Sequence, residues 1–338
     1  MSRLALFVLA AAVAGAAAAA QPPVPAPKAA APAPAKPWFV DDAKLFEDFM
    51  AKLTELGKAG KCLANDKLHD KMKPGTRAKL APAKPGDKAL SPEEVYKVAL
   101  PSVFIVGSVF KDKDGEWQDG LYATAWAASA DGVLVSNWHV FEDLEPNEVF
   151  GVADHKGTVY PVVDFLGGDK AADVAVFKID ARGLTPLPVA DEFAAVGSWV
   201  GVLSHPGDNF YLYTTGSVTR YSTNKNDDGK RERWMGLTAE FAGGSSGSPV
   251  LNKYGAVVGM SALTLTIEDG VPVPAPVQER RRLRARFRDE KPKAPPPKEK
   301  DKPEPKEEPK PAPGGGATVQ MVLKMAVPGP TILKSFEK

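Results

Sequence analysis

Residues 239–260, AEFAGGSSGSPVLNKYGAVVGM, enclose a short run of glycine and serine between two apolar stretches. Gly244 and Gly247 flank the pair Ser245 and Ser246, and glycine permits the tight turn and close backbone approach that a substrate carbonyl needs. A serine hydroxyl is a poor nucleophile unless a base and oxyanion donors lie beside it. We therefore predict that Ser246 is a nucleophile and that the chain supplies a histidine and an acid for it.

A histidine and an acid both stand beside apolar runs. The run VLVSNWHV, residues 133–140, predicts a buried strand that ends at His139. The three remaining histidines lie in a lysine-rich segment, in a loop and before a proline: His69, His155 and His205. Asp173 directly precedes the apolar run 174–176, where a carboxylate requires a partner because an unpaired buried charge costs several kcal/mol. We expect His139 and Asp173 to be the base and the acid.

In this order, the three segments resemble the trypsin-like (chymotrypsin-fold) serine peptidases, most closely the disulfide-free bacterial branch that includes the HtrA-like proteases. Residues 136–139 are similar to the family's Thr-Asn-x-His, residues 173–175 to its Asp-x-Ala, and residues 244–249 to its Gly-Asn/Asp-Ser-Gly-Gly-Pro. The resemblance covers roughly residues 90 to 338. It implies that His139, Asp173 and Ser246 form a catalytic triad. The oxyanion hole would consist of the backbone N–H groups of Gly244 and Ser246.

The turn departs from the family pattern at two positions. Ser245 stands where the digestive enzymes carry an aspartate that pairs with a newly cut N-terminus, so we do not expect activation by that route. Ser248 replaces the second glycine after the nucleophile, which leaves the N–H groups of Gly244 and Ser246 in place.

Many short apolar or alternating runs, separated by turn signals and without long helices, predict an all-β fold. These runs cover residues 102–110, 121–128, 133–140, 158–165, 174–179, 199–203, 211–221, 234–240 and 256–265. We expect two antiparallel six-stranded β-barrels of chymotrypsin type, with a short N-terminal helical extension and a C-terminal helix. The peptidase domain would span residues 90–338. His139 and Asp173 fall in its first half and Ser246 in its second, so the triad would span a cleft between the barrels.

The N-terminal part predicts export. In residues 1–20, Arg3 precedes an apolar run that ends in three alanines, as in a secretory signal peptide. A membrane anchor is the alternative, but a run of about 17 residues is at the lower limit for spanning. We expect cleavage, no stable membrane span afterwards, and a secreted or periplasmic protein. Residues 21–37 form a Pro/Ala-rich linker, and residues 38–89 a helical and Lys/Pro-rich extension.

Within this extension, apolar residues recur at helical spacing over residues 41–56, with Asp41 or Asp42 as the start and Gly57 as the stop. We expect this helix to pack on the peptidase domain, in preference to a membrane or partner role. A second helix is predicted from the capping box at Ser91 and Glu94, with Pro92 at its first position.

Composition narrows the chemistry further. The 338 residues carry a formal net charge of +1, which argues against a general nucleic-acid binder. Cys62 is the only cysteine, so no internal disulfide can form. One cysteine and four scattered histidines offer no metal-ligand spacing, and we expect no cofactor and no metal site.

Residues 269–317 predict a disordered, charged, Pro-rich insertion, because their composition cannot form a core. Residues 319–338 resemble the last strand and closing helix of the family, so the domain would be interrupted and then resumed. The insertion is either a solvated loop or a cationic arm that recruits an anionic polymer, surface or substrate. Its six arginines are Arg280, Arg281, Arg282, Arg284, Arg286 and Arg288.

Together these features predict an exported serine endopeptidase that acts on proteins or peptides through an acyl-enzyme intermediate. The alternative is a catalytically inactive trypsin-like barrel that binds peptides or a cell-surface partner. An esterase of the α/β-hydrolase type is disfavoured, because its elbow requires a following helix, whereas Ser246 precedes Pro249 and a strand. We expect no PDZ module after the domain, although HtrA-like proteins usually carry one.

Specificity is expected to depend on the wall residues before the nucleophile, as in the family. Glu240, six positions before Ser246, would favour Lys or Arg in the substrate if it faced the pocket. We favour instead a solvent-facing Glu240 and a small-to-medium apolar preference, which is common among the bacterial relatives.

Overall fold

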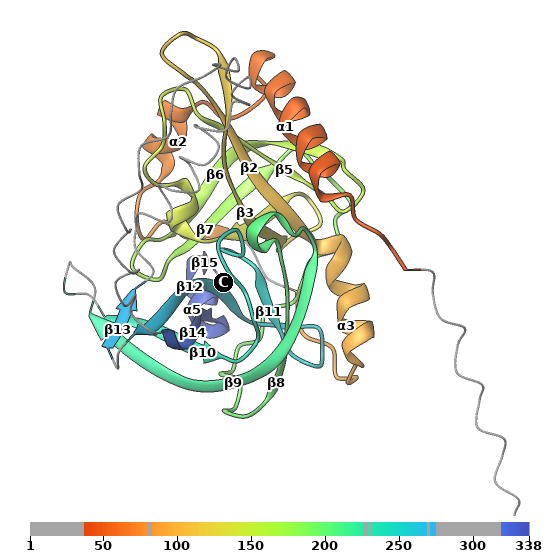
Figure 1. Ribbon diagram of the computed structural model, residues 1–338, viewed down its shortest axis with the longest axis vertical. Helices are drawn as coiled ribbons and strands as arrows, with labels where there is room; N and C mark the ends of the chain where they lie inside the picture. Colours follow the sequence, from red (N-terminus) through yellow and green to blue (C-terminus); the bar gives the residue numbers. More distant parts are fainter. Residues whose placement is uncertain are drawn as a thin grey trace, which may run out of the picture. The chain divides into compact units, whose positions relative to one another are not determined.

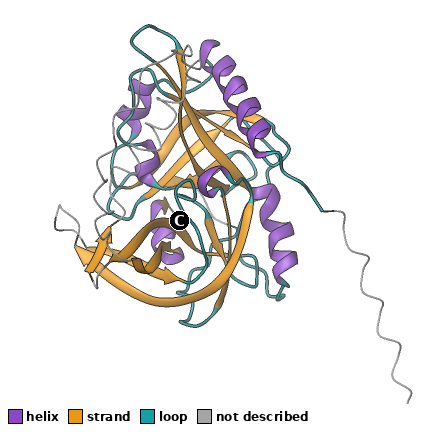
Figure 2. Ribbon diagram, viewed as in Figure 1, coloured by secondary structure: helices purple, strands orange, loops and turns teal. Residues whose placement is uncertain are grey.

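The computed structural model describes residues 37–79, 83–225, 229, 231–268, 271–274 and 319–337. The chain forms two units, Met1–Phe39 and Val40–Lys338, and the features below belong to the second. This unit is mostly β, with few helices among its described residues (Figures 1 and 2). The predicted signal peptide, nearly all of the predicted linker and most of the predicted insertion lie outside the described residues.

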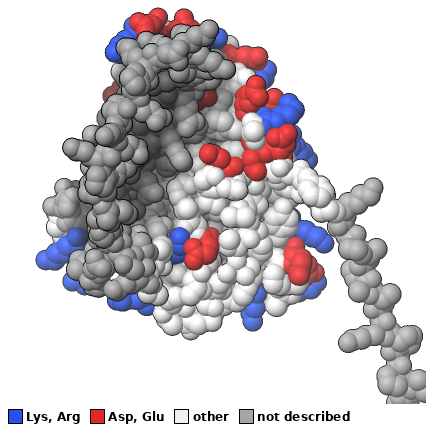
Figure 3. Space-filling view, viewed as in Figure 1, with Lys and Arg blue, Asp and Glu red and all other residues white. Residues whose placement is uncertain are grey.

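The predicted amphipathic helix is confirmed as α1, Asp42–Lys58. Asp41 caps it, since the Asp41 side chain accepts a hydrogen bond from the Lys44 N–H at 3.1 Å. The helix continues through Gly57, where the sequence predicted its end. Its buried face packs on the first barrel through Phe49, Met50 and Leu53. Its outer face carries charged side chains of both signs, including the ion pairs Lys44–Asp48 and Lys52–Glu55 (Figure 3).

Three further elements precede the barrels. Helix α2, Asn65–Lys71, and the two-residue strand β1, Ala78–Lys79, were not predicted. Helix α3, Pro92–Ala99, begins with the predicted capping box, in which Ser91 and Glu94 bond each other's backbone N–H. A 3₁₀ turn, Leu100–Ser102, then leads into the first barrel.

The first barrel is closed and consists of six antiparallel strands in the order β2-β3-β4-β7-β6-β5. These strands are β2 (Val103–Lys111), β3 (Trp117–Ala127), β4 (Val133–Ser136), β5 (Val149–Ala153), β6 (Val159–Asp169) and β7 (Val174–Ile179). A buried aromatic cluster lies in its core: Trp138, Phe141, Phe150, Phe165 and Phe177. The predicted first six-stranded barrel is therefore present.

The predicted strand over residues 133–140 is wrong in its second half. Strand β4 ends at Ser136, and His139 lies on the one-turn 3₁₀ helix η2, Trp138–Phe141. Asp173 causes the change, because its carbonyl accepts from the Asn137 side chain at 3.0 Å and its carboxylate accepts from the His139 N–H at 3.0 Å. These hydrogen bonds replace the β-ladder hydrogen bonds that a longer strand would make.

The second half of the unit forms a six-strand ring, in the order β11-β8-β9-β10-β14-β12, that closes because β11 also pairs with β12. Its strands are β8 (Trp199–Ser204), β9 (Leu212–Lys225), β10 (Arg231–Leu237), β11 (Pro249–Leu251), β12 (Val257–Glu268) and β14 (Val319–Pro328). A seventh strand, β13 (Val271–Pro274), adds to β12 outside the ring.

Strands β12 and β14 are antiparallel neighbours from Gly259↔Pro328 to Glu268↔Val319. The chain thus leaves the ring and re-enters it beside the same strand, as expected for an interrupted domain. The prediction that all of residues 269–317 is disordered is wrong for β13, whose residues pair in the sheet. The six arginines and the Lys/Pro/Glu tract lie outside the described residues.

The predicted C-terminal helix is short. It consists of the single turn α5, Gly329–Ile332, followed by a 3₁₀ turn, Leu333–Ser335. Strand β15, Phe336–Glu337, then pairs in parallel with β1 of the N-terminal extension. This pairing fastens the end of the chain to the segment that precedes the barrels.

Candidate active site

His139 and Asp173 form a close pair on the first barrel. The His139 Nδ1 atom lies 3.0 Å from Oδ1 and 2.8 Å from Oδ2 of Asp173. Asp173 stands just before β7 with a φ of 56°, a left-handed conformation that aims its side chain at η2. Both side chains are mostly buried, with 11% and 17% of their surface exposed. A carboxylate in this position orients the imidazole and stabilises its protonated form.

Ser246 from the second half of the unit completes the contact. Its Oγ lies 2.9 Å from the His139 Nε2 atom. Because Nδ1–H donates to Asp173, Nε2 carries the lone pair and accepts from the serine hydroxyl. The structure therefore brings together the three residues that the sequence selected, in one hydrogen-bonded series that crosses between the two sheets.

The turn that carries Ser246 requires glycine on both sides. Gly244 and Gly247 have φ of 93° and 89°, in the region that side chains rarely adopt. A Cβ at Gly244 would meet the carbonyl oxygen of His205 and the ring of Tyr122. A Cβ at Gly247 would meet the carbonyl oxygen of Thr124.

Thr124, on β3 of the first barrel, holds the turn from across the cleft. Its N–H donates to the Ser246 carbonyl at 2.8 Å, and its hydroxyl donates to the Gly244 carbonyl at 3.0 Å. Ser136, on β4, donates in turn to the Thr124 carbonyl at 2.7 Å. Thr124 and Ser136 are fully buried, so both hydroxyls need these partners.

The two other serines of the turn, Ser245 and Ser248, make structural contacts. Ser245 is buried, its Oγ accepts from the Ala242 N–H at 3.3 Å, and its carbonyl accepts from the Ser261 hydroxyl at 2.5 Å. Ser248 is also buried, and its N–H donates to the Ser245 carbonyl at 3.0 Å. Within the part of the chain that the structure describes, the N–H groups of Gly244 and Ser246 donate to no protein atom, so both are available to a ligand.

Aromatic rings connect α1 to this turn. Phe46 of α1 packs edge-on against Tyr122, with ring centroids 6.1 Å apart, and stacks on Phe210 at 6.1 Å. The Phe210 N–H also donates to the Asp42 carboxylate at the start of α1, at 2.8 Å. Since the Tyr122 ring borders Gly244, α1 supports the turn that carries Ser246 through Tyr122 of the first barrel.

None of the other three histidines hydrogen-bonds to Ser246 in the part of the chain that the structure describes. His205 is fully buried, and desolvation lowers its pKa to about 3, so the ring is neutral. Its Nδ1 accepts from the Tyr211 N–H at 3.0 Å. His155, between β5 and β6, has a pKa lowered by desolvation. His69 lies exposed on α2.

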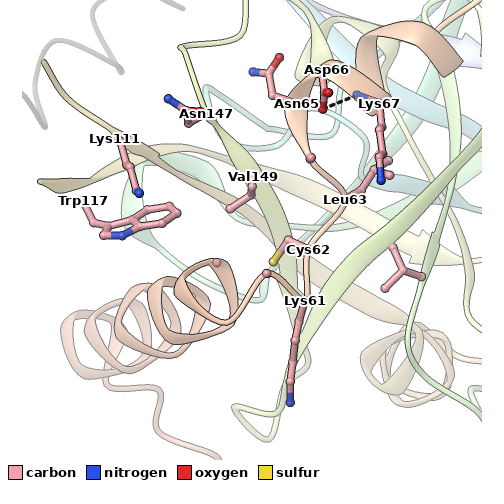
Figure 4. Close-up of a pocket in the computed structure, with 14 residues that line it drawn as sticks. Lys61, Cys62, Leu63, Asn65, Asp66, Lys67, Lys111, Trp117, Asn147 and Val149 are labelled. Carbon is pink, nitrogen blue, oxygen red and sulfur yellow. Dashed lines mark hydrogen bonds between the residues drawn. The ribbon is translucent and has the colours of Figure 1, made fainter. Parts of the chain in front are cut away.

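A groove of about 800 Å³ lies between the end of α1, the segment before α2 and the first barrel, with Lys111 and Trp117 at one end and Asp66 and Lys67 at the other (Figure 4). Cys62 lines it, and burial raises the pKa of this thiol to about 11, so it is protonated at neutral pH. His139, Asp173 and Ser246 do not line this groove.

Two absences hold for the described residues. Their side chains contain no group of three or more His, Cys, Asp or Glu that could hold a metal ion. None of their helices is both long enough and apolar enough to cross a membrane.

Sequence reasoning missed the residues that position the series. Asn137 was noted only as part of a motif, and Thr124 and Ser136 were assigned to strands. Their signal is a hydroxyl within an otherwise apolar run, LYATAWA for Thr124 and VLVS for Ser136. Such a hydroxyl implies a buried partner, but the sequence does not say which one.

Known proteins share the sequence that surrounds this site. Residues 123–260 match the family model described as trypsin-like peptidase domain. A "Probable periplasmic serine endoprotease DegP-like" from Chlamydia pneumoniae is 28% identical over 154 residues, 45% of this chain and 31% of that protein. "Serine endoprotease DegS" from Haemophilus influenzae is 24% identical over 186 residues, 53% of this chain and 54% of that protein.

A structure titled "Crystal structure of the serine endoprotease from Yersinia pestis" has 21% identity and a TM-score of 0.42, and covers 60% of this chain and 69% of its own. The chain spans about a third of the length of the DegP-like relative and about half of the DegS relative. The family match covers His139, Asp173 and Ser246. The chain thus carries a trypsin-like peptidase domain with homologues among the DegP-like and DegS serine endoproteases.

Proposed function

We propose that this protein is an exported serine endopeptidase that hydrolyses peptide bonds through a Ser-His-Asp triad. The observation that carries the proposal is the series Asp173–His139–Ser246, with 2.8 Å and 2.9 Å between successive polar atoms. These distances are within the range at which a base takes a proton from a nucleophile. The two sheets would then be the two barrels of the chymotrypsin type.

The mechanism follows from the roles that these atoms can take. Ser246 Oγ attacks the scissile carbonyl while its proton passes to His139 Nε2, and the carbonyl becomes a tetrahedral oxyanion. His139 then gives the proton to the leaving amine, which leaves an ester on Ser246. Water attacks this ester by the same route, with His139 again as the base, and the acid product is released. Asp173 stabilises the imidazolium in both steps.

The oxyanion needs donors that are not already engaged. The N–H groups of Gly244 and Ser246 meet this condition among the described residues, and both belong to the turn that presents the nucleophile. By analogy with other serine peptidases, one such donor contributes about 3 to 4 kcal/mol to the stabilisation of the transition state.

Substrates and location are inferred from the relatives and from the leader. A peptidase acts on protein or peptide chains, and a DegP-like relative is named periplasmic. We propose that residues 1–20 direct export and that the mature protein acts outside the cytoplasm. We also propose that the six arginines of the insertion attract anionic polymers, surfaces or substrates, which would make association with them salt-dependent.

The test is digestion of an unfolded general substrate such as casein by the mature protein, with new N-termini identified by mass spectrometry. Ser246→Ala should produce none of these termini above background. Ser222→Ala, a change of the same size on β9, should cleave like the parent. Equal cleavage by the parent and by Ser246→Ala would reject the proposal.

A further inference from the structure

A buried lysine stands in the wall beside the nucleophile turn. Lys324, on β14, has 7% of its surface exposed, which is rare for lysine. Its Nζ donates to the Phe241 carbonyl at 2.5 Å and lies 5.6 Å from the centre of the Phe241 ring. The same ammonium pairs with Glu240 Oε2 at 3.1 Å. Glu240 itself is solvent-facing, with 74% of its side chain exposed, as the sequence favoured.

Main-chain contacts bring this ammonium close to Ser246. Phe241 is followed by Ala242, whose carbonyl accepts from the Ser245 N–H at 3.0 Å. On the opposite wall, the Ser261 carbonyl of β12 accepts from the Gly247 N–H at 3.0 Å. Lys324 is the partner of Thr264, three residues further along β12. The Lys324 ammonium therefore contacts Phe241, which precedes the Ser246 turn, and the strand that carries Lys324 pairs with β10 on one side and with β12 on the other.

The edge of β12 next to the turn is open. On the side away from β14, β11 pairs with β12 only up to Met260, and β13 pairs with it only from Leu265 onward. Among the described strands, Leu263 and Thr264 therefore pair with β14 alone, and Ala262 lies at a register shift with no strand partner. An extended peptide can add a strand at such an edge. A peptide bound there has its scissile bond near Ser246 and one side chain directed between the walls toward Lys324.

Only one of the two groups that contact the Lys324 ammonium is held rigidly. A lysine ammonium has three N–H donors, of which Phe241 and Glu240 take one each. The Phe241 carbonyl is fixed in the backbone, whereas the Glu240 carboxylate is exposed, and exposed ion pairs are weak. A substrate carboxylate can replace the Glu240 carboxylate or use the third donor, and it gains a charge-assisted bond in a mostly buried site.

We propose that Lys324 is a specificity-determining residue that selects an acidic side chain, Glu or Asp, at the substrate residue before the scissile bond. The proposal rests on the proposed peptidase function. In the free protein the Glu240 carboxylate occupies the position that the substrate carboxylate takes. This replaces the small-to-medium apolar preference that the resemblance suggested.

The test compares internally quenched peptides that differ only in having Glu, Gln, Val or Lys before the scissile bond. The parent should cleave the Glu peptide with a kcat/KM at least tenfold above the Gln peptide, which matches it in size. Lys324→Met keeps the apolar stem and should bring the Glu-to-Gln ratio close to one. Glu240→Gln removes the competing carboxylate and should raise the ratio severalfold. Lys334→Met, at an exposed lysine on the 3₁₀ turn Leu333–Ser335, is the control and should leave the ratio unchanged.

The outcomes separate two failures. A parent that cleaves the peptides without preferring Glu over Gln keeps its function, but it shows that Glu240 neutralises Lys324 and overturns the specificity. A parent that cleaves none of the peptides and does not digest casein contradicts the proposed function and the specificity with it. If Lys324→Met does not fold, the Glu-to-Gln ratio of the parent and its rise in Glu240→Gln still test the proposal. Glu240 is exposed, so its substitution should not prevent folding.

Discussion

The two halves of the unit hold their parts of the site by different means. On the first barrel, His139 belongs to η2, whose neighbours Trp138 and Phe141 pack in the aromatic cluster, with ring centroids 4.9 to 5.7 Å apart. In the second ring the separate core cluster is smaller and mostly aliphatic, with Phe241 as its buried aromatic residue, and the Ser246 turn is held mainly by hydrogen bonds. Two of these bonds come from Thr124 of the first barrel. The nucleophile turn therefore depends on the opposite half for its shape, whereas the His139–Asp173 pair lies wholly within its own.

The largest expected effect is on the shared reaction. Ser246→Ala should lower kcat by about a millionfold, as loss of the nucleophile does in subtilisin. Asp173→Asn should lower it by about ten-thousandfold, as the same change of the triad aspartate does in trypsin. If the two halves act as one unit, His139→Ala combined with Ser246→Ala should cost no more than Ser246→Ala alone. Peptide hydrolysis with purified variants measures this. A double variant whose loss equals the product of the single losses would show two independent contributions.

Gly247→Ala tests whether the first barrel shapes the turn. The new Cβ would press on the Thr124 carbonyl at a positive φ, so we expect the amides to move and kcat to fall about a hundred- to a thousandfold. Gly60→Ala is the control, because Gly60 also has a positive φ, of 65°, but has no atom within 4 Å of the added Cβ. It should cost about 1 kcal/mol of unfolding free energy and no activity. Equal activity of Gly247→Ala and the parent would show that the contact with Thr124 of the first barrel does not shape the Ser246 turn.

The neutral His205 predicts an acid sensitivity that originates in the second half. Its folded pKa of about 3 lies below the ordinary value of 6.5, so below pH 6.5 the unfolded chain binds a proton that the folded chain does not. Stability is therefore present above pH 6.5 and is lost as the pH falls, by about 2 kcal/mol between pH 6.5 and 4.5.

His205→Asn keeps an acceptor for the Tyr211 N–H and should lose this part of the pH dependence. Urea unfolding of both proteins at pH 7.0 and 4.5 measures the difference. Parallel losses in the two proteins would mean that His205 titrates normally.

The smallest effect concerns the support from α1. Phe46→Ala removes a half-buried ring from Tyr122 and Phe210 and should cost about 1 to 2 kcal/mol of unfolding free energy. Because Tyr122 borders Gly244, kcat should fall about tenfold with little change in KM. Glu47→Ala, on the exposed face of the same helix, serves as the control. If the two variants have the same kcat, α1 contributes stability alone.

The sequence predicted those parts of the molecule in which local chemistry decides the structure. The cap at Asp41, the capping box at Ser91 and most strands follow from side-chain pattern, and the structure contains them. The end of the strand before His139 did not follow, because the Asp173 bonds that stop it come from 34 residues away. The short α2 and the strand Val149–Ala153 were likewise missed, because each is too short for a clear periodicity.

For the site, the sequence selected His139, Asp173 and Ser246 from their order and neighbours, and the structure brings their side chains within hydrogen-bonding distance. It did not identify the partner of the Thr124 hydroxyl, and it did not single out Lys324. Thr124 acts through a contact across 120 residues, and Lys324 follows the insertion by several residues and meets Phe241 because β14 lies beside β10, which ends shortly before Phe241. Long-range pairings of this kind leave no local pattern.

The central claim is that Ser246 is a nucleophile activated by His139 from the opposite half of the unit. The most direct measurement is labelling of the mature protein with a fluorophosphonate, followed by mass spectrometry of the peptide that carries the adduct. The account predicts one adduct per chain, on Ser246, and its loss in Ser246→Ala and in a correctly folded His139→Ala. Absence of labelling in the folded parent, or an adduct on Ser245 or another serine, would contradict it.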